Sequence, residues 1–589
     1  MRFLRIVLAS VVGLVVFFGI LILVLIGIAS SAASEQEVDI EDQSVLRIEL
    51  DKPIVERDIE EPLSSMLFPG SSNGSIGLIG LNEAIKKAKE DDRIKGIYLD
   101  AGISLAGFAS LKEIRNSLLD FKESGKFIIA YSEILSERAY YLTSIADYIY
   151  LHPLGDLEFN GLVVEVTFIK NMLEKLGVEP QVFRVGDFKS AIEPLTRTDM
   201  SDSSRLQTQE YVSNMYNVFL EEISASRNIP VVTLREIADS MKVRSPEEAK
   251  TYGLITDTAY YDIVLQTIAK ELNLEDSVEL NEDDINFVSL KNYEKAIGQE
   301  TEDYTRNRVA VIVATGTIIN GEGEGSVIGG ETFAKEIRKA RLDDNIKAIV
   351  LRINSGGGSA LASDIMWREI QLAKKVKPVI ASMSDVAASG GYYMAMGCDT
   401  IVAHPNTITG SIGIFGVVPN AQELLQKIGV TTDYVQTGQF SNLFSLTRPM
   451  SSNGKQIIQN QVEQGYEDFT RKAANGRNMS QAQLKSVASG RVWSGVEAKE
   501  KNLIDVFGGL DVAIEIALDK AGLEDDYQIK YYPKQKTFFE QIMTELGQEI
   551  RVYQLKRELG IAYPFIHKLK ELEYLQGIQA RMPFEIEVK

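Results

Sequence analysis

Short apolar runs alternate with amphipathic stretches along most of the chain, and this alternation predicts an α/β fold. In the second half, apolar strands are expected at residues 309–314, 348–353, 379–383 and 400–403. Helices are expected between them, for example over residues 359–375.

The longest apolar stretch lies near the N-terminus. Residues 6–29 are almost unbroken in their apolar character and are long enough to cross a bilayer as a helix. Arg2 and Arg5 precede the stretch, whereas the linker at 31–43 is acidic. The positive-inside rule therefore predicts that residues 1–30 hold a cytoplasmic N-terminus and a membrane anchor, with the bulk of the chain outside.

A cleaved signal peptide is the alternative interpretation of this stretch. The small residues at 31–34 (SAAS) could form a cleavage site. However, the apolar core of a signal peptide usually has about 7–15 residues. The longer run at 6–29 favours a retained anchor.

The chain also contains an internal duplication. Residues 91–99 (DDRIKGIYL) match residues 343–351 (DDNIKAIVL) at an offset of 252 residues. The same offset relates further pairs: Tyr140-Tyr141 and Tyr392-Tyr393, His152-Pro153 and His404-Pro405, and Gly186 and Gly438. Several matches in one order predict two tandem repeats.

The repeats are expected at residues 44–300 and 306–525, followed by a C-terminal extension at 526–589. The extension carries no recognisable motif. Its residues 584–588 alternate between apolar and charged, as an edge strand does.

Composition excludes several classes of function. With 62 Lys and Arg against 83 Asp and Glu, the net charge of −21 argues against a nucleic-acid partner. The single cysteine, Cys398, excludes an intrachain disulfide and a multi-cysteine metal site. No HExxH motif occurs and the three histidines are far apart, which argues against a zinc site. No cofactor is expected.

The repeats differ where chemistry is expected. Ser389 lies on a turn of small residues, and its counterpart in the first repeat is Glu137. Conversely, Lys189 of the first repeat corresponds to Ser441 of the second. One repeat therefore has a candidate nucleophile and the other a candidate base, which suggests one site shared between them.

A serine nucleophile needs a base. The chain has only three histidines, and His152 and His404 are expected to pack at strand ends. A lysine can replace histidine when burial keeps its amine neutral. Lys189 has apolar neighbours that could desolvate it.

A glycine loop follows the strand expected at 348–353. Glycines in residues 354–359 (NSGGGS) could direct their N–H groups at a developing oxyanion, and Gly390 could supply a second donor. Phosphate binding is the alternative, but the loop lacks the Gly-Lys-Ser/Thr ending of a P-loop.

Taken together, four motifs resemble the signal peptide peptidase A (protease IV) family in its long, duplicated, membrane-anchored form. They are 354–359 (NSGGGS), 387–392 (AASGGY), 409–413 (TGSIG) and 186–190 (GDFKS). The resemblance covers nearly the whole chain and implies a Clp protease/crotonase-like fold (a ββα superhelix) in each repeat.

The resemblance also implies roles for single residues. Ser389 would be the nucleophile and Lys189 the general base of a Ser–Lys dyad. Ser411 would orient the lysine amine, and Gly357 and Gly390 would line the oxyanion hole. The implied protein is a serine endopeptidase that degrades released signal peptides and other short apolar peptides.

The family further implies a homotetramer, anchored by residues 6–29 in the bacterial cytoplasmic membrane with its bulk on the periplasmic side. One position departs from the family pattern: Gly356 stands where the family usually has proline. The loss of proline removes a constraint on φ and makes the unbound loop more flexible.

Two other functions are compatible with the pattern. A crotonase-like enzyme acting on acyl thioesters would share the fold and the oxyanion loop without needing Ser389 or Lys189. A catalytically silent envelope scaffold would use the glycine turns for packing alone.

Overall fold

The computed structural model describes most of the chain between residues 39 and 534, together with a C-terminal strand. The described ranges are 12–14, 16–17, 19, 39–58, 74–274, 280–299, 305–323, 325, 327–524, 526–534 and 577–582. Most of the span predicted at residues 6–29, and residues 584–588, lie outside them. Within these ranges, no helix is both long enough and apolar enough to cross a membrane.

The first repeat forms a parallel sheet in the order β8-β6-β5-β4-β1-β9. Its strands are β1 (Ser44–Glu49), β4 (Ile94–Asp100), β5 (Phe127–Leu135), β6 (Tyr148–Leu157), β8 (Asp257–Thr258) and β9 (Phe287–Ser289). Alternate strand residues face opposite sides. Ile128 and Ala130 pack under helices such as α3 (Leu78–Glu90) and α4 (Phe108–Lys122). Ile129 packs under α11 (Tyr261–Glu271) on the other face.

The second repeat forms its own sheet in the order β19-β17-β15-β13-β10-β21, with β16 and β20 attached through β15. Its strands are β10 (Arg308–Thr315), β13 (Ile346–Ser355), β15 (Val379–Ala388), β16 (Thr400–Ala403), β17 (Ile408–Gly410), β19 (Val492–Ser494), β20 (Val506–Phe507) and β21 (Gln528–Tyr532). Helices that pack on one face include α13 (Gly330–Leu342), α14 (Ala360–Ala373), α15 (Gly390–Ala395), α17 (Ser452–Gly476), α18 (Gln481–Val487) and α19 (Gly495–Glu500). On the other face lies α20 (Leu510–Ala521).

The structure confirms the duplication and the α/β class. Helices α13 and α14 begin 252 residues after α3 and α4, and strands β13, β15 and β16 begin 252 residues after β4, β5 and β6. Strands are present at all four positions expected in the second repeat, and α14 occupies the helix expected over 359–375.

A third sheet joins the two repeats, in the order β12-β11-β14-β22-β18-β7. It takes β7 (Glu179–Arg184) from the first repeat. The other strands are β11 (Thr317–Ile319), β12 (Val327–Gly329), β14 (Gly357–Ser359), β18 (Phe415–Asn420) and the C-terminal β22 (Gly577–Arg581). This sheet contains Gly357 in β14, and its strands β7 and β18 lie next in the chain to the segments that carry Lys189 and Ser411.

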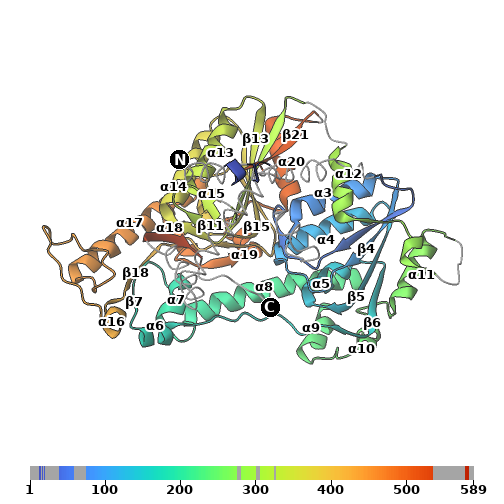
Figure 1. Cartoon of the computed structure of the whole chain (residues 1–589), viewed down its shortest axis with the longest axis horizontal. Coiled ribbons are helices and arrows are strands. Elements are labelled where there is room, and N and C mark those ends of the chain that lie inside the picture. Colours follow the sequence, from blue (N-terminus) through green and yellow to red (C-terminus); the bar gives the residue numbers. More distant parts are fainter. Residues whose placement is uncertain are drawn as a thin grey trace, which may run out of the picture.

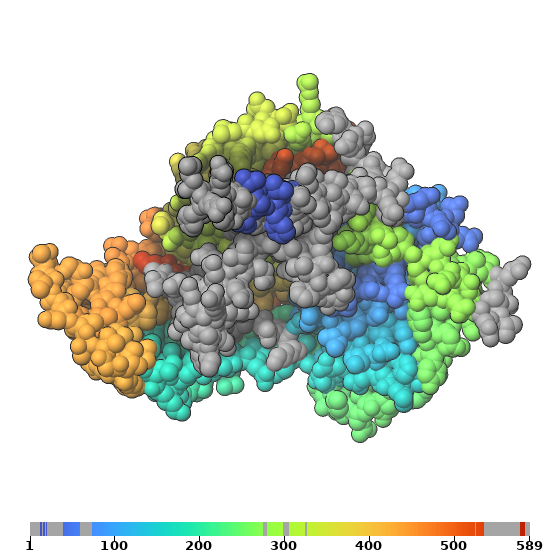
Figure 2. Space-filling model, viewed as in Figure 1, coloured from blue at the N-terminus to red at the C-terminus, as the bar shows by residue number. Residues whose placement is uncertain are grey.

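One segment of the first repeat, residues 170–196, extends to the second repeat and is called the excursion. After β6, the chain forms α6 (Lys170–Leu176), β7, a 3₁₀ turn (Ser190–Ile192) and α7 (Glu193–Thr196) beside β18. The long helix α8 (Asp202–Arg227) then returns to the first repeat (Figure 1). Its 26 residues span about 39 Å at about 1.5 Å per residue. In the space-filling view, the teal surface of the excursion touches the orange surface of the second repeat (Figure 2).

The remaining elements lie around these sheets. They are β2 (Ile54–Val55) and β3 (Ile76–Gly77), which pair with each other, α5 (Glu137–Thr143), α9 (Val231–Asp239), α10 (Pro246–Thr251), a 3₁₀ turn (Glu282–Asp284), α12 (Leu290–Gln299) and α16 (Gln422–Lys427).

Candidate active site

Ser389 lies at the junction between β15 and α15. Its backbone has φ 56° and ψ −110°, a left-handed φ that non-glycine residues rarely adopt. Its N–H donates to the carbonyl of Gly410 at 2.8 Å, and its carbonyl accepts from the N–H of Tyr393 at 2.8 Å. The strained turn is thus fixed by β17 on one side and by α15 on the other.

Lys189 arrives from the first repeat on the excursion. Strand β7 pairs antiparallel with β18 along its whole length, and the chain then turns at Gly186 (φ 94°). A Cβ on Gly186 would lie 2.3 Å from the carbonyl oxygen of Ser489, and a Cβ on Gly490 would lie 2.6 Å from Lys189 Cβ. These glycines therefore permit the close backbone approach that docks Lys189 onto the second repeat.

The two candidate residues meet. Lys189 Nζ lies 2.8 Å from Ser389 Oγ, although the residues are 200 positions apart in sequence. Both side chains are completely buried. The first repeat thus contributes an amine, and the second a hydroxyl, to one enclosed site.

Burial sets the electrostatics of the amine. It lowers the pKa of Lys189 well below the ordinary value of 10.5, because the charged form loses its hydration. The amine also contacts Ser411, with Nζ 3.0 Å from the carbonyl oxygen and 3.0 Å from Oγ. A neutral amine has two N–H donors and one lone pair, which match three such contacts.

Ser411 is itself held in a defined position. It follows β17 with φ 49°, and its N–H donates to the carbonyl of Arg491 at 2.7 Å. Its contacts place it against the lysine amine, where the family resemblance expects it. The orienting role remains a prediction.

The glycine loop lies beside the nucleophile. A Cβ on Gly357 would lie 2.6 Å from the N atom of Gly390, so the two predicted oxyanion residues are neighbours. The N–H of Gly357, however, donates to Ser355 Oγ at 3.1 Å within the loop. Gly358 lies opposite Ala580 of β22. The oxyanion role of Gly357 and Gly390 remains a prediction, and Gly358 is a neighbouring candidate.

The space around position 356 does not require a glycine there. Its φ lies outside the left-handed range, and a Cβ there would make only ordinary contacts with Met582, the nearest at 3.5 Å. Its carbonyl accepts from the N–H of Met582 at 2.6 Å. The residue directly after β22 thus holds the glycine loop at Gly356.

Neither described histidine contacts the lysine amine. His404 is buried, with Nε2 3.1 Å from Glu113 Oε1. The ring of His152 packs edge-on against Tyr260. The third, His567, lies outside the described residues.

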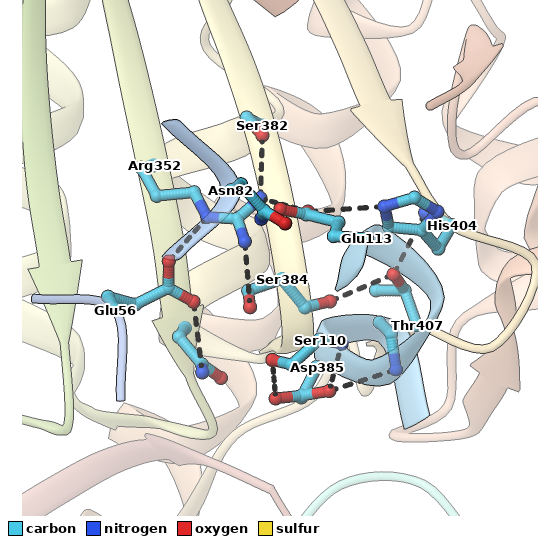
Figure 3. A network of polar contacts seen from close by, with 12 residues as sticks. Glu56, Asn82, Ser110, Glu113, Arg352, Ser382, Ser384, Asp385, His404 and Thr407 are labelled. Atoms are coloured by element: carbon cyan, nitrogen blue, oxygen red, sulfur yellow. Dashed lines mark hydrogen bonds and ion pairs between the residues drawn. The ribbon is translucent and has the colours of Figure 1, made fainter. Parts of the chain in front are cut away.

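A buried polar network that was not predicted from the sequence links the two repeats (Figure 3). Arg352 of β13 is fully buried and reaches two carboxylates of the first repeat, Glu56 at 2.7 Å and Glu113 at 2.7 Å. The same guanidinium donates to Ser382 and Ser384 of β15. The available signal was an arginine within an apolar strand. Its two carboxylate partners lie more than 200 residues away in the sequence.

The two carboxylates respond differently to burial. Burial raises the pKa of Glu56, and Arg352 offsets this rise only in part. Burial also tends to raise the pKa of Glu113. Arg352 and His404 outweigh this effect and hold the pKa of Glu113 at about 2. Glu113 is therefore the firmly ionised partner of Arg352.

Asp385 adds a second link from β15 to the first repeat. Its carboxylate accepts from the N–H groups of Ala109 (3.0 Å) and Ser110 (2.9 Å) in the first turn of α4, and from Ser110 Oγ at 2.6 Å. The carboxylate therefore caps a helix of the other repeat. A Cβ on Gly107 would lie 2.2 Å from it, so glycine leaves the space for this contact. Both links hold the strand that ends at Ser389.

Comparisons with known proteins identify the family of the chain. The model of peptidase family S49 matches residues 120–275 and 371–524, one region in each repeat. "Protease 4" of Haemophilus influenzae is 32% identical over 95% of this chain and 93% of its own length. "Protease 4" of Salmonella typhi is 34% identical over 91% of this chain and 87% of its own length. "Serine protease SPPA, chloroplastic" of Arabidopsis thaliana is 34% identical over 87% of this chain and 74% of its own length.

A solved structure of a ClpP1 mutant from Listeria monocytogenes is 16% identical and covers 34% of this chain and 91% of its own. Its TM-score of 0.24 is too low to support an argument about the fold. The family match and the three relatives span both repeats at substantial identity. The chain belongs to peptidase family S49 and is a serine peptidase of the protease IV (SppA) type.

Proposed function

We propose that the protein is a membrane-anchored serine endopeptidase in which Ser389 and Lys189 form the catalytic dyad. The observation that carries the proposal is the 2.8 Å separation of Lys189 Nζ and Ser389 Oγ in a buried site. Because burial lowers the pKa of Lys189 well below its ordinary value, it favours the neutral amine that can act as a base.

Acylation begins when neutral Lys189 takes the proton of Ser389 Oγ and the oxygen bonds to the scissile carbonyl carbon. The carbonyl electron pair moves onto oxygen, and backbone amides of Gly390 and the glycine loop stabilise this oxyanion. The oxyanion then collapses and the C–N bond breaks. The lysine ammonium gives its proton to the leaving amine, and an ester remains on Ser389.

Deacylation repeats these steps with water. Lys189 takes a proton from water as the water oxygen attacks the ester carbonyl. When the C–O bond breaks, the lysine returns the proton to Ser389 Oγ and the carboxylic acid product leaves. Ser411, which contacts the amine through both of its oxygens, holds Nζ in line throughout the cycle.

The setting of the enzyme is part of the same proposal. Residues 6–29 form the anchor, and the acidic linker that follows supports a location of the bulk on the periplasmic side of a bacterial cytoplasmic membrane. The substrates are released signal peptides and other short apolar peptides. A homotetramer is the assembly that the family resemblance implies.

The dyad geometry also separates the rival functions. Acyl-thioester chemistry on this type of fold needs an oxyanion hole but no buried lysine against a serine. A silent scaffold has no reason to bury an amine, which costs stability when the amine is charged. The contact between Lys189 and Ser389 therefore favours a peptidase over both.

The pH profile of peptide hydrolysis tests the proposal. Only neutral Lys189 accepts the serine proton, so kcat/KM is lost as pH falls through the lowered pKa of Lys189. The profile should therefore reach its plateau well below pH 10.5. It is measured with the full chain and a short apolar peptide, with circular dichroism at each pH to confirm folding. A limb that still climbs near pH 10.5 contradicts a lysine base with a lowered pKa.

Ser411→Ala should lower kcat roughly 10- to 100-fold, the cost of one lost hydrogen bond to a group that becomes charged during the reaction. KM should change little, because the Ser411 hydroxyl contacts the lysine amine. Ser441→Ala, at an exposed serine, is the matched control and should be silent. Equal kinetics in Ser411→Ala and wild type would remove Ser411 from the mechanism.

A further inference from the structure

Lys189 lies at the centre of a tight turn. Its backbone has φ −77° and ψ 73°, and the N–H of Ser190 donates to the carbonyl of Phe188 at 2.8 Å. These dihedral angles and this i to i+2 hydrogen bond define an inverse γ-turn. The turn sets the direction of the lysine side chain. Because the amine stands at the far end of that long side chain, a small rotation of the turn would displace Nζ from Ser389 Oγ.

One side chain of the long helix α8 holds both ends of this turn. Gln207 Nε2 donates to the carbonyl of Phe188 at 3.2 Å and to Ser190 Oγ at 2.9 Å. The two N–H donors of one amide group therefore hold the residue on each side of Lys189. Gln207 is only 1% exposed and Ser190 is completely buried, so water competes little for these contacts.

The same amide reaches the second repeat through its oxygen. Gln207 Oε1 accepts from the N–H of Val492 in β19 at 3.2 Å. The partners fix the orientation of the amide, because the Phe188 carbonyl can only accept and the Val492 N–H can only donate. The amide therefore bridges the two repeats with both of its polar atoms in use.

Val492 belongs to a strand that supports the rest of the site. β19 pairs antiparallel with β17, so that Val492 lies opposite Gly410. The carbonyl of Gly410 accepts from the N–H of Ser389 at 2.8 Å, and the carbonyl of Arg491 accepts from the N–H of Ser411 at 2.7 Å. The amide on α8 thus connects the segment that carries the base to the strands that hold the nucleophile.

The helix docks on the second repeat through other side chains as well. Asn214 Nδ2 donates to Ser494 Oγ at 3.1 Å, and Glu210 forms an ion pair with Arg491. Removal of the Gln207 amide alone therefore leaves α8 attached to the second repeat.

The amide suits its place because it carries no charge. An ionised carboxylate beside Lys189 would favour the charged form of the amine, which cannot accept the proton of Ser389. Glutamine supplies two donors and an acceptor without such a charge.

Resting on the proposed function above, we propose that Gln207 is a positioning residue of the catalytic dyad. Its amide locks the turn at Lys189 against β19, so that Nζ stays within reach of Ser389 Oγ while the lysine gains and loses a proton. The role needs no contact with the substrate.

Gln207→Met tests the proposal, because methionine keeps the length of glutamine and removes its hydrogen bonds. We expect kcat for a short apolar peptide to fall roughly 10- to 100-fold, as for a catalytic group displaced by about 1 Å. KM should stay within about twofold, since the buried amide acts through Lys189. The reaction of Ser389 with a fluorophosphonate should slow by a similar factor. A loss of kcat/KM that comes entirely from KM overturns the inference.

Asn214→Leu is the matched control. Asn214 also joins α8 to the second repeat through a side-chain amide, but its partner is Ser494 and not the turn at Lys189. Its kcat should stay within about twofold of wild type, whatever the change in thermal midpoint. Equal kcat in folded Gln207→Met and Asn214→Leu overturns the inference.

A double-mutant cycle with Ser190→Ala shows whether Gln207 acts through the turn. Ser190→Ala removes one partner of the amide and should lower kcat roughly two- to fivefold, the usual cost of one hydrogen bond. Added to Gln207→Met, it should change kcat by less than about twofold, because the contact is already lost. Independent effects of the two substitutions would overturn the route through the turn.

Gln207→Asn covers the case in which methionine prevents folding. Its amide is one methylene too short to bridge Phe188 and Val492, so kcat should again fall with KM unchanged. Wild-type kcat in this variant would overturn the inference. Hydrolysis that survives Lys189→Met would instead overturn the proposed function. An inactive Lys189→Met beside Gln207→Met with wild-type kinetics would overturn the inference alone, so the two failures are distinguishable.

Discussion

Lys189→Met abolishes peptide hydrolysis, with an expected fall in kcat of about 10⁴-fold or more, as for the loss of a catalytic base in other serine peptidases. Methionine keeps the length and apolar stem of lysine but cannot accept the proton of Ser389. The fold should survive, because the substitution removes an amine that is costly to bury when charged. The measurement is single-substrate kinetics with a thermal melt of the same sample.

Lys170→Met is the matched control. Lys170 belongs to the same excursion of the first repeat, but its side chain is 40% exposed and pairs with Glu174 on α6. Its replacement should leave kcat within about twofold, since exposed ion pairs contribute little. Comparable turnover in Lys189→Met and Lys170→Met would refute the dyad.

Arg352→Met should destabilise the protein by about 3–5 kcal/mol, the usual cost of breaking a buried ion pair by removing one partner. Arg352 is fully buried between Glu56 and Glu113, so its loss leaves two buried carboxylates without their cation. The measurement is the free energy of unfolding from urea titration, with the slope checked for two-state behaviour.

The control for Arg352 is Arg338→Met. Arg338 also pairs with a glutamate, Glu369, at 2.6 Å, but its side chain is 53% exposed. The expected cost there is below about 1 kcal/mol. If both variants lose the same stability, the network in Figure 3 does not hold the repeats together.

Arg352→Met should also affect catalysis where the protein remains folded. The guanidinium donates to Ser382 and Ser384 on β15, the strand that ends at the nucleophile. We expect kcat to fall more than KM rises, because Arg352 positions Ser389 without touching the substrate. The rate of Ser389 acylation by a fluorophosphonate reports this displacement independently of peptide binding.

The sequence predicts the two halves of the site because the duplication exposes them. Ser389 stands where the first repeat has Glu137, and Lys189 stands where the second has Ser441. A shared site is the simplest account of that complementarity, and the 2.8 Å contact agrees with it. The strands expected at 309–314, 348–353, 379–383 and 400–403 and the helix expected over 359–375 were equally predictable, because their apolar pattern is local.

The contacts between the repeats could not be predicted in this way. Arg352 meets Glu56 across 296 residues and Glu113 across 239, and no local pattern encodes such a distance. The same holds for Asp385, which looks like an ordinary turn residue until α4 of the other repeat is in place. Strand β22 was also missed, because a strand of five residues has no periodicity strong enough to stand out.

The most direct test of the shared site is to trap and map its acyl-enzyme. The full chain is incubated with a slowly deacylating ester of a short apolar peptide, quenched in acid and analysed by intact mass and peptide mapping. The account predicts one acyl group, located on Ser389, that forms at least about 100-fold more slowly in Lys189→Met. An acyl group on another residue, or equal rates of acylation in Lys189→Met and wild type, would contradict a nucleophile from one repeat activated by a lysine from the other.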